Sequence, residues 1–367
     1  MKYVIFGAGH IGEKILAEYG RTLEIETIFD NYAGGGYYGR TIRKPEYEKN
    51  IFIIVCSERY YEIRKQLLEM GYSEFNDFVP YRIFNKKMAI AYGNCHMGAV
   101  KQYLERNKGL ASDYGFYPFP AIQYMETLDN YQKVLPYCDL FIHQSIRETN
   151  KFGAEYASNS MIDYLSKKCK VLSIPNLYGM PDCFFPQQSA GGTKGWGCFC
   201  HFFAGEEENV KKWLEMGKTE EDIKEYMLHG GVYHKKEIQE KWNEFKTKLL
   251  QREKEWDIKI SDYIFDNYKY KKLFYEKFHI SDILVKEIAS RILNHLGYNG
   301  EIPYTLSPLD NNEMFIYQDV MDALDLKFEQ KYIRLHHRDY SLTLVDMDID
   351  QYVYQLCKCI IRSENDD

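Results

Sequence analysis

Short apolar runs alternate with amphipathic stretches in the first part of the chain, which is the pattern of a sheet covered by helices. Residues 2–6 are an apolar run that predicts a buried strand, followed by a glycine-rich turn and a helix. Further strands are predicted at 24–30 and 51–57, and a second helix at 58–70. Strand, helix, strand, strand and helix within about 80 residues is one half of a doubly wound unit.

The second part of the chain repeats the order of strand, turn and helix after a polar break at residues 84–87. The predicted elements are strands at 88–92, 139–143 and 171–174 and a helix from about 98 to 105. This alternation favours a second parallel sheet.

Two helical regions follow in the second part. Residues 206–256 are rich in Lys and Glu and are broken at Gly230–Gly231, which predicts a solvated helical hairpin packed on the sheet. Residues 281–296 predict an amphipathic helix whose apolar stripe is Ile283, Leu284, Ile288, Ile292 and Leu296. We therefore predict an α/β protein with a small N-terminal Rossmann-like parallel-sheet domain over residues 1–85 and a larger α/β domain with a helical insertion over 88–367.

Composition excludes several classes of function. The 367 residues carry 47 Lys and Arg against 54 Asp and Glu, a net charge of −7, so a nucleic-acid partner is not expected. No apolar run approaches the about 20 residues of a membrane span, and the N-terminus lacks the features of a signal peptide, so a cytoplasmic location is expected. The nine cysteines lack zinc-site spacing, and Cys198, Cys200 and His201 have no second ligand pair, so no metal is expected.

The glycine-rich turn near the N-terminus is the first candidate site. Gly7, Gly9 and Gly12 follow a strand and open a helix, and Asp30 ends the next strand. Such glycines let backbone N–H groups approach a phosphate, and the acid can bind ribose hydroxyls. A nucleotide or nucleotide sugar is therefore a candidate ligand. The alternative, a turn that is merely tight, stays open because one mononucleotide half alone is present.

The turn Gly93-Asn94-Cys95-His96 is the second candidate site. It joins a strand to a helix, so the Cys95 thiol lies at a helix N-terminus, where the dipole and free N–H groups favour the thiolate. The same N–H groups can bind an oxyanion during acyl transfer. SGNH-type esterases carry Gly-Asp-Ser at such a turn. Cys95 and Asn94 are therefore candidate catalytic residues, and the alternative is that Cys95 only packs the turn.

From about Met88 onward the chain resembles the WcbI-type polysaccharide biosynthesis enzymes, acetyltransferases of capsule gene clusters. The resemblance rests on several short segments in order, which are the Gly93-Asn94-Cys95 turn, the strand Asp139 to Gln144, Ile174 to Tyr178, Pro181-Asp182, Asp257 to Ile264, Leu273 to Tyr275, His279 and the helix Leu284 to Leu296. The family's late Asn-His-Pro is Phe278-His279-Ile280 in this chain, so the His is kept and its neighbours differ.

The resemblance implies that coenzyme A or acetyl-CoA is the acyl donor and that a sugar of a capsule or exopolysaccharide is the acceptor. It points to His279, expected at the start of a helix, as the base that pairs with Cys95. His143 is the second candidate base because it ends a predicted strand, where open α/β sheets bind ligands. Gly93, His96, Gln144 and Arg147 are the candidate coenzyme-binding residues, with Arg147 paired to a phosphate.

Three functions remain open on the sequence. The first is transfer of acetyl from acetyl-CoA to a small-molecule or oligosaccharide acceptor, alongside other polysaccharide-biosynthesis enzymes. The second is an SGNH-like esterase that removes acetyl groups from glycans, since it needs the same nucleophile. The third is a non-catalytic protein that binds coenzyme A or a nucleotide sugar. The loop Gly191 to Gly197, with Trp196, is a candidate cover for the bound ligand or a plain surface loop.

Overall fold

The computed structural model describes residues 2–125, 128–188, 207–303, 309, 313–337 and 343–365. The chain divides into two compact units whose residues lie close together in space, and each unit is made of three segments. Unit 1 is Met1–Tyr92, Lys108–Ile142 and Asn159–Val171, and unit 2 is Gly93–Asn107, His143–Ser158 and Leu172–Asp367. The chain therefore leaves unit 1 directly after Tyr92, at the turn that carries Cys95.

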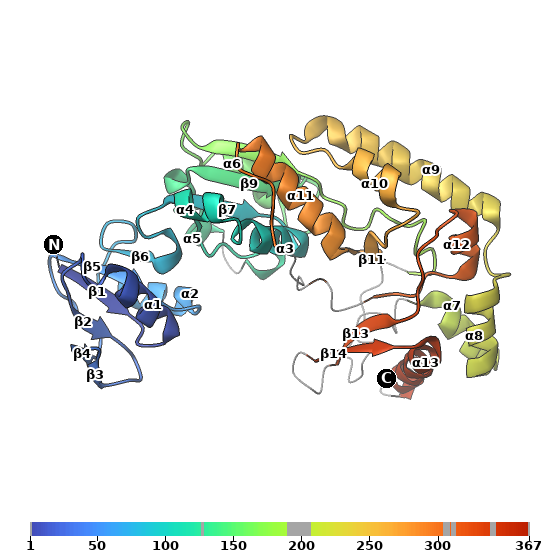
Figure 1. Cartoon of the computed structure of the whole chain (residues 1–367), viewed down its shortest axis with the longest axis horizontal. Helices are drawn as coiled ribbons and strands as arrows, with labels where there is room; N and C mark the ends of the chain where they lie inside the picture. The colour runs from blue at the N-terminus through green and yellow to red at the C-terminus, as the bar shows by residue number, and fades with distance from the viewer. Residues whose placement is uncertain are drawn as a thin grey trace. The chain divides into compact units, whose positions relative to one another are not determined.

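A six-stranded sheet with two helices forms the first part of unit 1 (Figure 1). Its elements are β1 (Lys2–Phe6), α1 (His10–Tyr19), β2 (Ile25–Phe29), β3 (Gly35–Tyr37), β4 (Arg40–Arg43), β5 (Ile51–Val55), α2 (Tyr60–Glu69) and β6 (Phe78–Pro80). The strand order is β3-β4-β2-β1-β5-β6, parallel except for the β3–β4 pair. The Rossmann-like prediction is confirmed, and β3, β4 and β6 are strands that the sequence pattern did not predict.

The core of this sheet explains why its central strands read as continuous apolar runs. Ile5, Ile53, Ile54 and Val55 are fully buried, and Ile28 on the neighbouring strand is as well. A parallel strand is covered on both faces, so alternation of polar and apolar residues is lost. The three missed strands are three or four residues long, too short to show a period.

A four-stranded sheet, ordered β10-β9-β7-β8, is the second sheet of the fold. Its strands are β7 (Lys87–Tyr92), β8 (Tyr114–Phe116), β9 (Leu140–Gln144) and β10 (Lys170–Ile174), and β7 and β8 run parallel. Short helices and 3₁₀ turns connect the strands: η1 (Tyr81–Ile83), α4 (Lys108–Asp113), η2 (Ile122–Tyr124), α5 (Asp129–Gln132), η3 (Leu135–Tyr137), η4 (Ala154–Tyr156) and α6 (Ser158–Ile162). The α/β fold class is thus as predicted.

Helices dominate unit 2. In chain order they are α3 (Cys95–Leu104), α7 (Glu208–Glu215), α8 (Glu220–His229), α9 (Lys235–Arg252), η5 (Glu253–Glu255), α10 (Ser261–Asn267), α11 (Asp282–His295), α12 (Gln318–Ala323) and α13 (Ile349–Asn365). Two short hairpins accompany them: β11 (Phe274–Glu276) with β12 (His279–Ile280), and β13 (Ile333–His337) with β14 (Thr343–Met347). In the described ranges, no helix has both the length and the apolar composition needed to cross a membrane.

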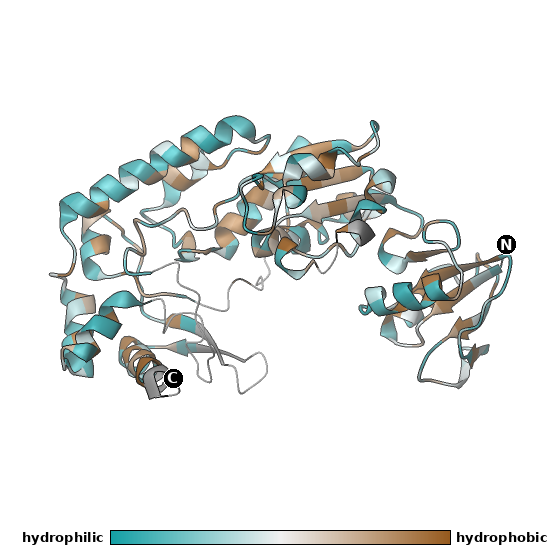
Figure 2. Cartoon of the chain, turned by 180° about the vertical axis from the view of Figure 1, so that it is seen from behind, coloured by the Kyte–Doolittle hydropathy of each residue, from teal (hydrophilic) through white to brown (hydrophobic). Residues whose placement is uncertain are grey.

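The predicted helical hairpin at 206–256 is three helices. Gly230 and Gly231 separate α8 from α9 as expected, and a second break at Gly217, where φ is +75°, separates α7 from α8. The longest helix, α9, is largely hydrophilic in Figure 2 and buries a single narrow stripe, which includes Trp242 and Phe245. It packs against α10 and α12, as Figure 1 shows.

Helix α11 lies beside α3 in unit 2 (Figure 1). Its buried face is Leu284, Val285, Ile288, Ala289, Ile292 and Leu293. The predicted stripe was wrong at Ile283, which is 37% exposed, because the residue lies about 100° around the helix from Leu284. The helix also begins three residues after His279, so the prediction that His279 opens it was wrong.

Candidate functional site: a cysteine, histidine and glutamate

Cys95 is the first residue of α3, directly after the β7 strand and its turn. The helix was predicted to begin near residue 98, but it begins one turn earlier because Asn94 caps it. The Asn94 side chain accepts a hydrogen bond from the N–H of His96 at 3.0 Å, which satisfies one of the unpaired donors of the first turn. The thiol therefore lies at the positive end of the helix dipole.

Gly93 is required at this turn by close packing rather than by its backbone angles. A Cβ atom at Gly93 would lie 2.3 Å from the Gln144 side-chain oxygen and 2.8 Å from the Cβ of Met97. That same Gln144 oxygen accepts the N–H of Asn94 at 2.8 Å, and its amide donates to the Pro175 carbonyl at 3.3 Å. Gln144 is buried and holds the turn in place.

His279 is the imidazole that the fold brings to Cys95. Its ring interacts with the Cys95 thiol, and its Nδ1 lies 2.8 Å from a carboxylate oxygen of Glu276. Since Nδ1 faces the carboxylate, Nε2 is the ring nitrogen left for the thiol. Cysteine, histidine and glutamate thus form a chain of contacts in the order that activates a nucleophile.

The electrostatics of this chain favour a positively charged imidazole. Burial alone would lower the pKa of His279, but the hydrogen bonds with Cys95 and Glu276, together with the negative charge of Glu276, raise it to about 10. A cationic imidazole beside a cysteine side chain is the arrangement typical of a cysteine nucleophile and its base.

Glu276 and His279 share one tight hairpin, which explains their fixed separation. Strands β11 and β12 pair residue 276 with residue 279, and two residues form the connection. Glu276 is 2% exposed, and its second carboxylate oxygen accepts the N–H of Phe278 at 2.7 Å. The acid of the site therefore comes from the same local unit as the base.

His96 is buried next to the thiol but faces the protein. Its Nε2 lies 2.6 Å from the Phe278 carbonyl, so this nitrogen carries the proton and donates. Burial of the ring is the larger cause, and the charge of the neighbouring His279 the smaller one, of a His96 pKa that is lowered to about 3. The ring thus stays neutral and ties α3 to the hairpin that carries Glu276 and His279.

His143 lies on the face of β9 opposite to that of Gln144. Successive residues of a strand point to opposite faces, and Gln144 is the residue that reaches the Asn94 turn. His143 instead interacts with Asp257, whose carboxylate accepts the Ser173 N–H and hydroxyl, both at 2.8 Å. Burial lowers the pKa of His143.

Two arginines lie near the Asn94 turn. Arg252, at the end of α9, donates a hydrogen bond to the Asn176 carbonyl at 3.4 Å. The side-chain oxygen of Asn176 in turn accepts a hydrogen bond from the side-chain amide of Asn94 at 3.5 Å. Burial and, to a smaller extent, the positive charge of Arg147 lower the pKa of Arg252, so the two guanidinium groups repel each other. Neighbouring like charges of this kind favour binding of an anion.

The N-terminal glycine turn has its acid engaged by the backbone. Asp30 accepts the N–H of Ala8 at 2.9 Å and two further N–H groups of its own loop. Burial opposes ionisation, but these hydrogen bonds lower the pKa of Asp30. Gly7 has φ +119°, and a Cβ on Gly12 would meet the Gly7 carbonyl at 2.2 Å, whereas a Cβ on Gly9 has nothing within 4 Å. Two of the three glycines are thus needed by the turn itself.

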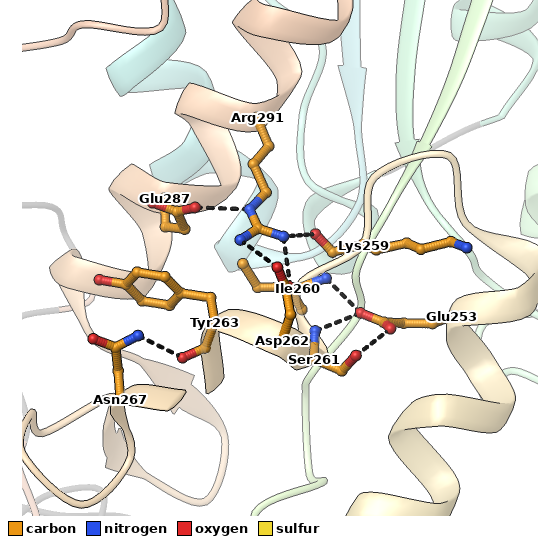
Figure 3. Close-up of polar contacts among 9 residues, drawn as sticks. All are labelled: Glu253, Lys259, Ile260, Ser261, Asp262, Tyr263, Asn267, Glu287 and Arg291. Carbon is orange, nitrogen blue, oxygen red and sulfur yellow. Dashed lines mark hydrogen bonds and ion pairs between the residues drawn. The ribbon is translucent and has the colours of Figure 1, made fainter. Parts of the chain in front are cut away.

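A polar network fixes the segment between α9 and α11 (Figure 3). Arg291 on α11 pairs with both oxygens of Asp262 on α10, at 2.7 and 3.0 Å, and with Glu287 at 2.7 Å. The buried Glu253 accepts the N–H and the hydroxyl of Ser261, the first residue of α10 (Figure 3). The segment 257–264, which carried part of the resemblance, is therefore structural.

Glu276 is the site residue that the sequence analysis missed. Its signal was the spacing to His279, three residues apart across a hairpin turn, which was hidden by the expectation of a helix there. Cys198, Cys200, His201 and the loop 191–197 lie outside the described residues. Among the residues that the structure describes, no group of three His, Cys, Asp or Glu side chains is arranged to hold a metal ion.

Comparison with known proteins gives two matches. The sequence model of a family described as "Polysaccharide biosynthesis enzyme WcbI" matches residues 88–301, more than half of the chain. A solved structure of WcbI, described as a novel polysaccharide biosynthesis enzyme and as the native protein without a disulfide bond between coenzyme A and a cysteine, is similar in fold. It has a TM-score of 0.60 and 21% identity over 76% of this chain and 90% of that chain. No curated protein matches the sequence.

Proposed function

The chain belongs to the WcbI family of polysaccharide biosynthesis enzymes, and from this premise we propose that it transfers an acetyl group from acetyl-CoA to a sugar hydroxyl. The observation that carries the proposal is the contact chain from Cys95 through His279 to Glu276. The description of the solved WcbI structure, which mentions coenzyme A and a cysteine, supports a thiol close to the coenzyme. The acceptor is a small-molecule or oligosaccharide building block of a capsule or exopolysaccharide, made in the cytoplasm together with other enzymes of that synthesis.

In the first step, the Cys95 proton resides on His279 and the thiolate attacks the carbonyl carbon of the thioester. The N–H groups of residues 96 to 98 already bond to Asn94, which leaves the N–H of Cys95 in the first turn to stabilise the oxyanion. The bond between the carbonyl carbon and the coenzyme sulfur then breaks, and His279 returns its proton to that sulfur. An acetyl-cysteine remains on the enzyme.

In the second step, a sugar hydroxyl attacks the acetyl-cysteine while His279 accepts the hydroxyl proton. The bond between the acetyl carbon and the Cys95 sulfur breaks, and Cys95 leaves as the thiolate beside the protonated imidazole. The acetyl ester is formed and the starting ion pair is regenerated. Splitting one hard transfer into two easier steps is the advantage of a covalent intermediate.

The residues around the turn suit an anionic acyl donor. The phosphates of coenzyme A need cationic partners, and Arg147 and Arg252 supply two guanidinium groups in the same unit as Cys95. We expect Arg252→Gln to weaken coenzyme A binding about tenfold, measured by titration calorimetry. Lys248→Gln, at the exposed face of the same helix, is the matched control and should leave affinity unchanged.

The deciding experiment mixes the protein with acetyl-CoA and follows the intact mass of the chain. We expect a gain of one acetyl group, located on Cys95 by peptide mapping and absent in Cys95→Ala. If Cys95→Ala still transfers acetyl to sugars while His279→Ala does not, the transfer is direct and His279 deprotonates the acceptor. Release of acetate from an acetylated glycan would identify an esterase, and ligand binding without chemistry would identify a binding protein.

For the N-terminal module, a nucleotide or nucleotide sugar at the Gly7 to Gly12 turn is the ligand we propose. The support is the turn's place between a parallel strand and a helix N-terminus. A thermal-shift screen with NAD and UDP-sugars tests it. Stabilisation that is lost in Gly9→Ala supports a site at this turn, because a Cβ at Gly9 has no protein atom within 4 Å and would instead occupy ligand space.

A further inference from the structure

Glu276 is held by a second buried side chain that the mechanism above does not use. Gln188, 3% exposed, donates from its amide nitrogen to the Glu276 carboxylate at 2.7 Å. This bond falls on the oxygen that also accepts the Phe278 N–H, so the other oxygen is left to His279. Each carboxylate oxygen therefore has an assigned partner.

The orientation of the Gln188 amide is fixed by its other end. Its oxygen accepts the N–H of Lys277 at 2.8 Å, so the nitrogen must face Glu276. The backbone of Gln188 is fixed as well, since it forms a β-bridge with Glu207 and its carbonyl accepts from the Lys277 ammonium at 3.3 Å. A glutamine held at both ends cannot release the carboxylate without breaking several bonds.

We propose that Gln188 is a positioning residue of the acyl-transfer site, an assignment that rests on the function proposed above. By donating to one oxygen of Glu276, Gln188 satisfies that oxygen in a buried place and aims the other oxygen at His279. A neutral donor does this without cancelling the charge, which a lysine or arginine would do. His279 is thereby kept as the cation that the thiolate of Cys95 needs.

Other charged groups near the hairpin do not supply this function. His96, whose ring centroid is 6.1 Å from that of His279, is neutral. The Lys277 ammonium is 2.6 Å from Asp182 and is paired there. Gln188 and the Phe278 N–H are thus the two donors that the structure shows on the Glu276 oxygen facing away from His279.

The test compares Gln188→Met with Gln187→Met. Gln187 is the matched control because it is adjacent, 2% exposed, and donates to the Phe315 carbonyl instead of to Glu276. The assay is the pH dependence of Cys95 alkylation by iodoacetamide in the full chain, which needs no acetyl-CoA. We expect the midpoint to move upward by about one pH unit in Gln188→Met and to stay in place in Gln187→Met.

The rate of Cys95 acetylation at neutral pH should fall about tenfold in Gln188→Met, with the KM for acetyl-CoA unchanged. Should Gln188→Met fail to fold, Gln188→Asn, which withdraws the amide by one methylene, must show the same upward midpoint. An unmoved midpoint in a folded Gln188 variant, or equal shifts in both glutamine variants, overturns the proposal. If wild-type protein is never acetylated, the proposed function fails, while the alkylation comparison still decides the role of Gln188.

Discussion

Replacement of the Glu276 carboxylate by an amide is the perturbation that examines the site most directly. In Glu276→Gln the new side chain has the same shape, and its oxygen can still accept from Gln188 and Phe278. The amide nitrogen then faces Nδ1 of His279, where the wild type has a carboxylate oxygen at 2.8 Å. Nδ1 must lose its proton to accept this bond, so Nε2 keeps a proton and cannot take one from Cys95.

The size of the effect follows from the pKa of His279. Its value of about 10 lies about 3.5 above the ordinary 6.5, which corresponds to about 5 kcal/mol in favour of the imidazolium. If Glu276 supplies about half of this, its removal costs about 2–3 kcal/mol, or about 30–160-fold in rate. The wrong tautomer adds to the loss, because the same change in a serine protease triad lowers kcat about 10⁴-fold. We expect Cys95 acetylation to slow by about 10³–10⁴-fold.

The assay is rapid mixing with acetyl-CoA, acid quench and intact mass, at neutral pH. Glu313→Gln is the matched control, because Glu313 is also a largely buried carboxylate in unit 2, paired with Lys272 at 2.7 Å. It should lose stability but keep the acetylation rate. An acetylation rate of Glu276→Gln within a factor of three of wild type would refute the role given to the carboxylate.

Three further predictions follow from the same geometry. Gly93→Ala would place a Cβ 2.3 Å from a buried side-chain oxygen and should cost about 1–3 kcal/mol in the free energy of unfolding by urea, whereas Gly98→Ala, with nothing within 4 Å, should be neutral or stabilising. Iodoacetamide at neutral pH should label Cys95 first and spare Cys357, since burial raises the pKa of Cys357 to about 12; equal labelling by peptide mass would contradict this. Because the folded pKa of His279 lies above its unfolded value, its contribution to stability should be complete below about pH 6.5 and lost as the pH rises through about 10, and urea titrations of His279→Gln should lack this loss.

The local pattern around Cys95 was predictable because each part of it depends on near neighbours. An apolar strand, a glycine, a capping asparagine and an amphipathic helix define a strand-to-helix turn, and the thiol follows Asn94 directly. The same reasoning located β1, β5 and α11 to within two residues. The α/β class follows from that order of elements, since parallel strands need crossover connections.

The partners of Cys95 were decided by tertiary structure. From the residues alone, His143 and His279 were both open as the base, and the resemblance favoured His279. The pleat of β9 turns His143 away from the turn, toward Asp257. No local pattern could show this, because the face on which a strand residue points depends on which neighbour fixes its register.

Glu276 and Gln188 illustrate the limit most clearly. Their sequence context is an aromatic stretch and a Pro-Gln-Gln segment, neither of which indicates a polar site. Burial turns them into a connected pair, because a carboxylate out of water must find donors, and the fold supplies two at 2.7 Å. The sequence alone determined where the Cys95 thiol is presented. The packing of the hairpin of β11 and β12 against α3 decided which charges surround the thiol. Coulomb energies depend on distances between charges, and only the folded chain sets those distances.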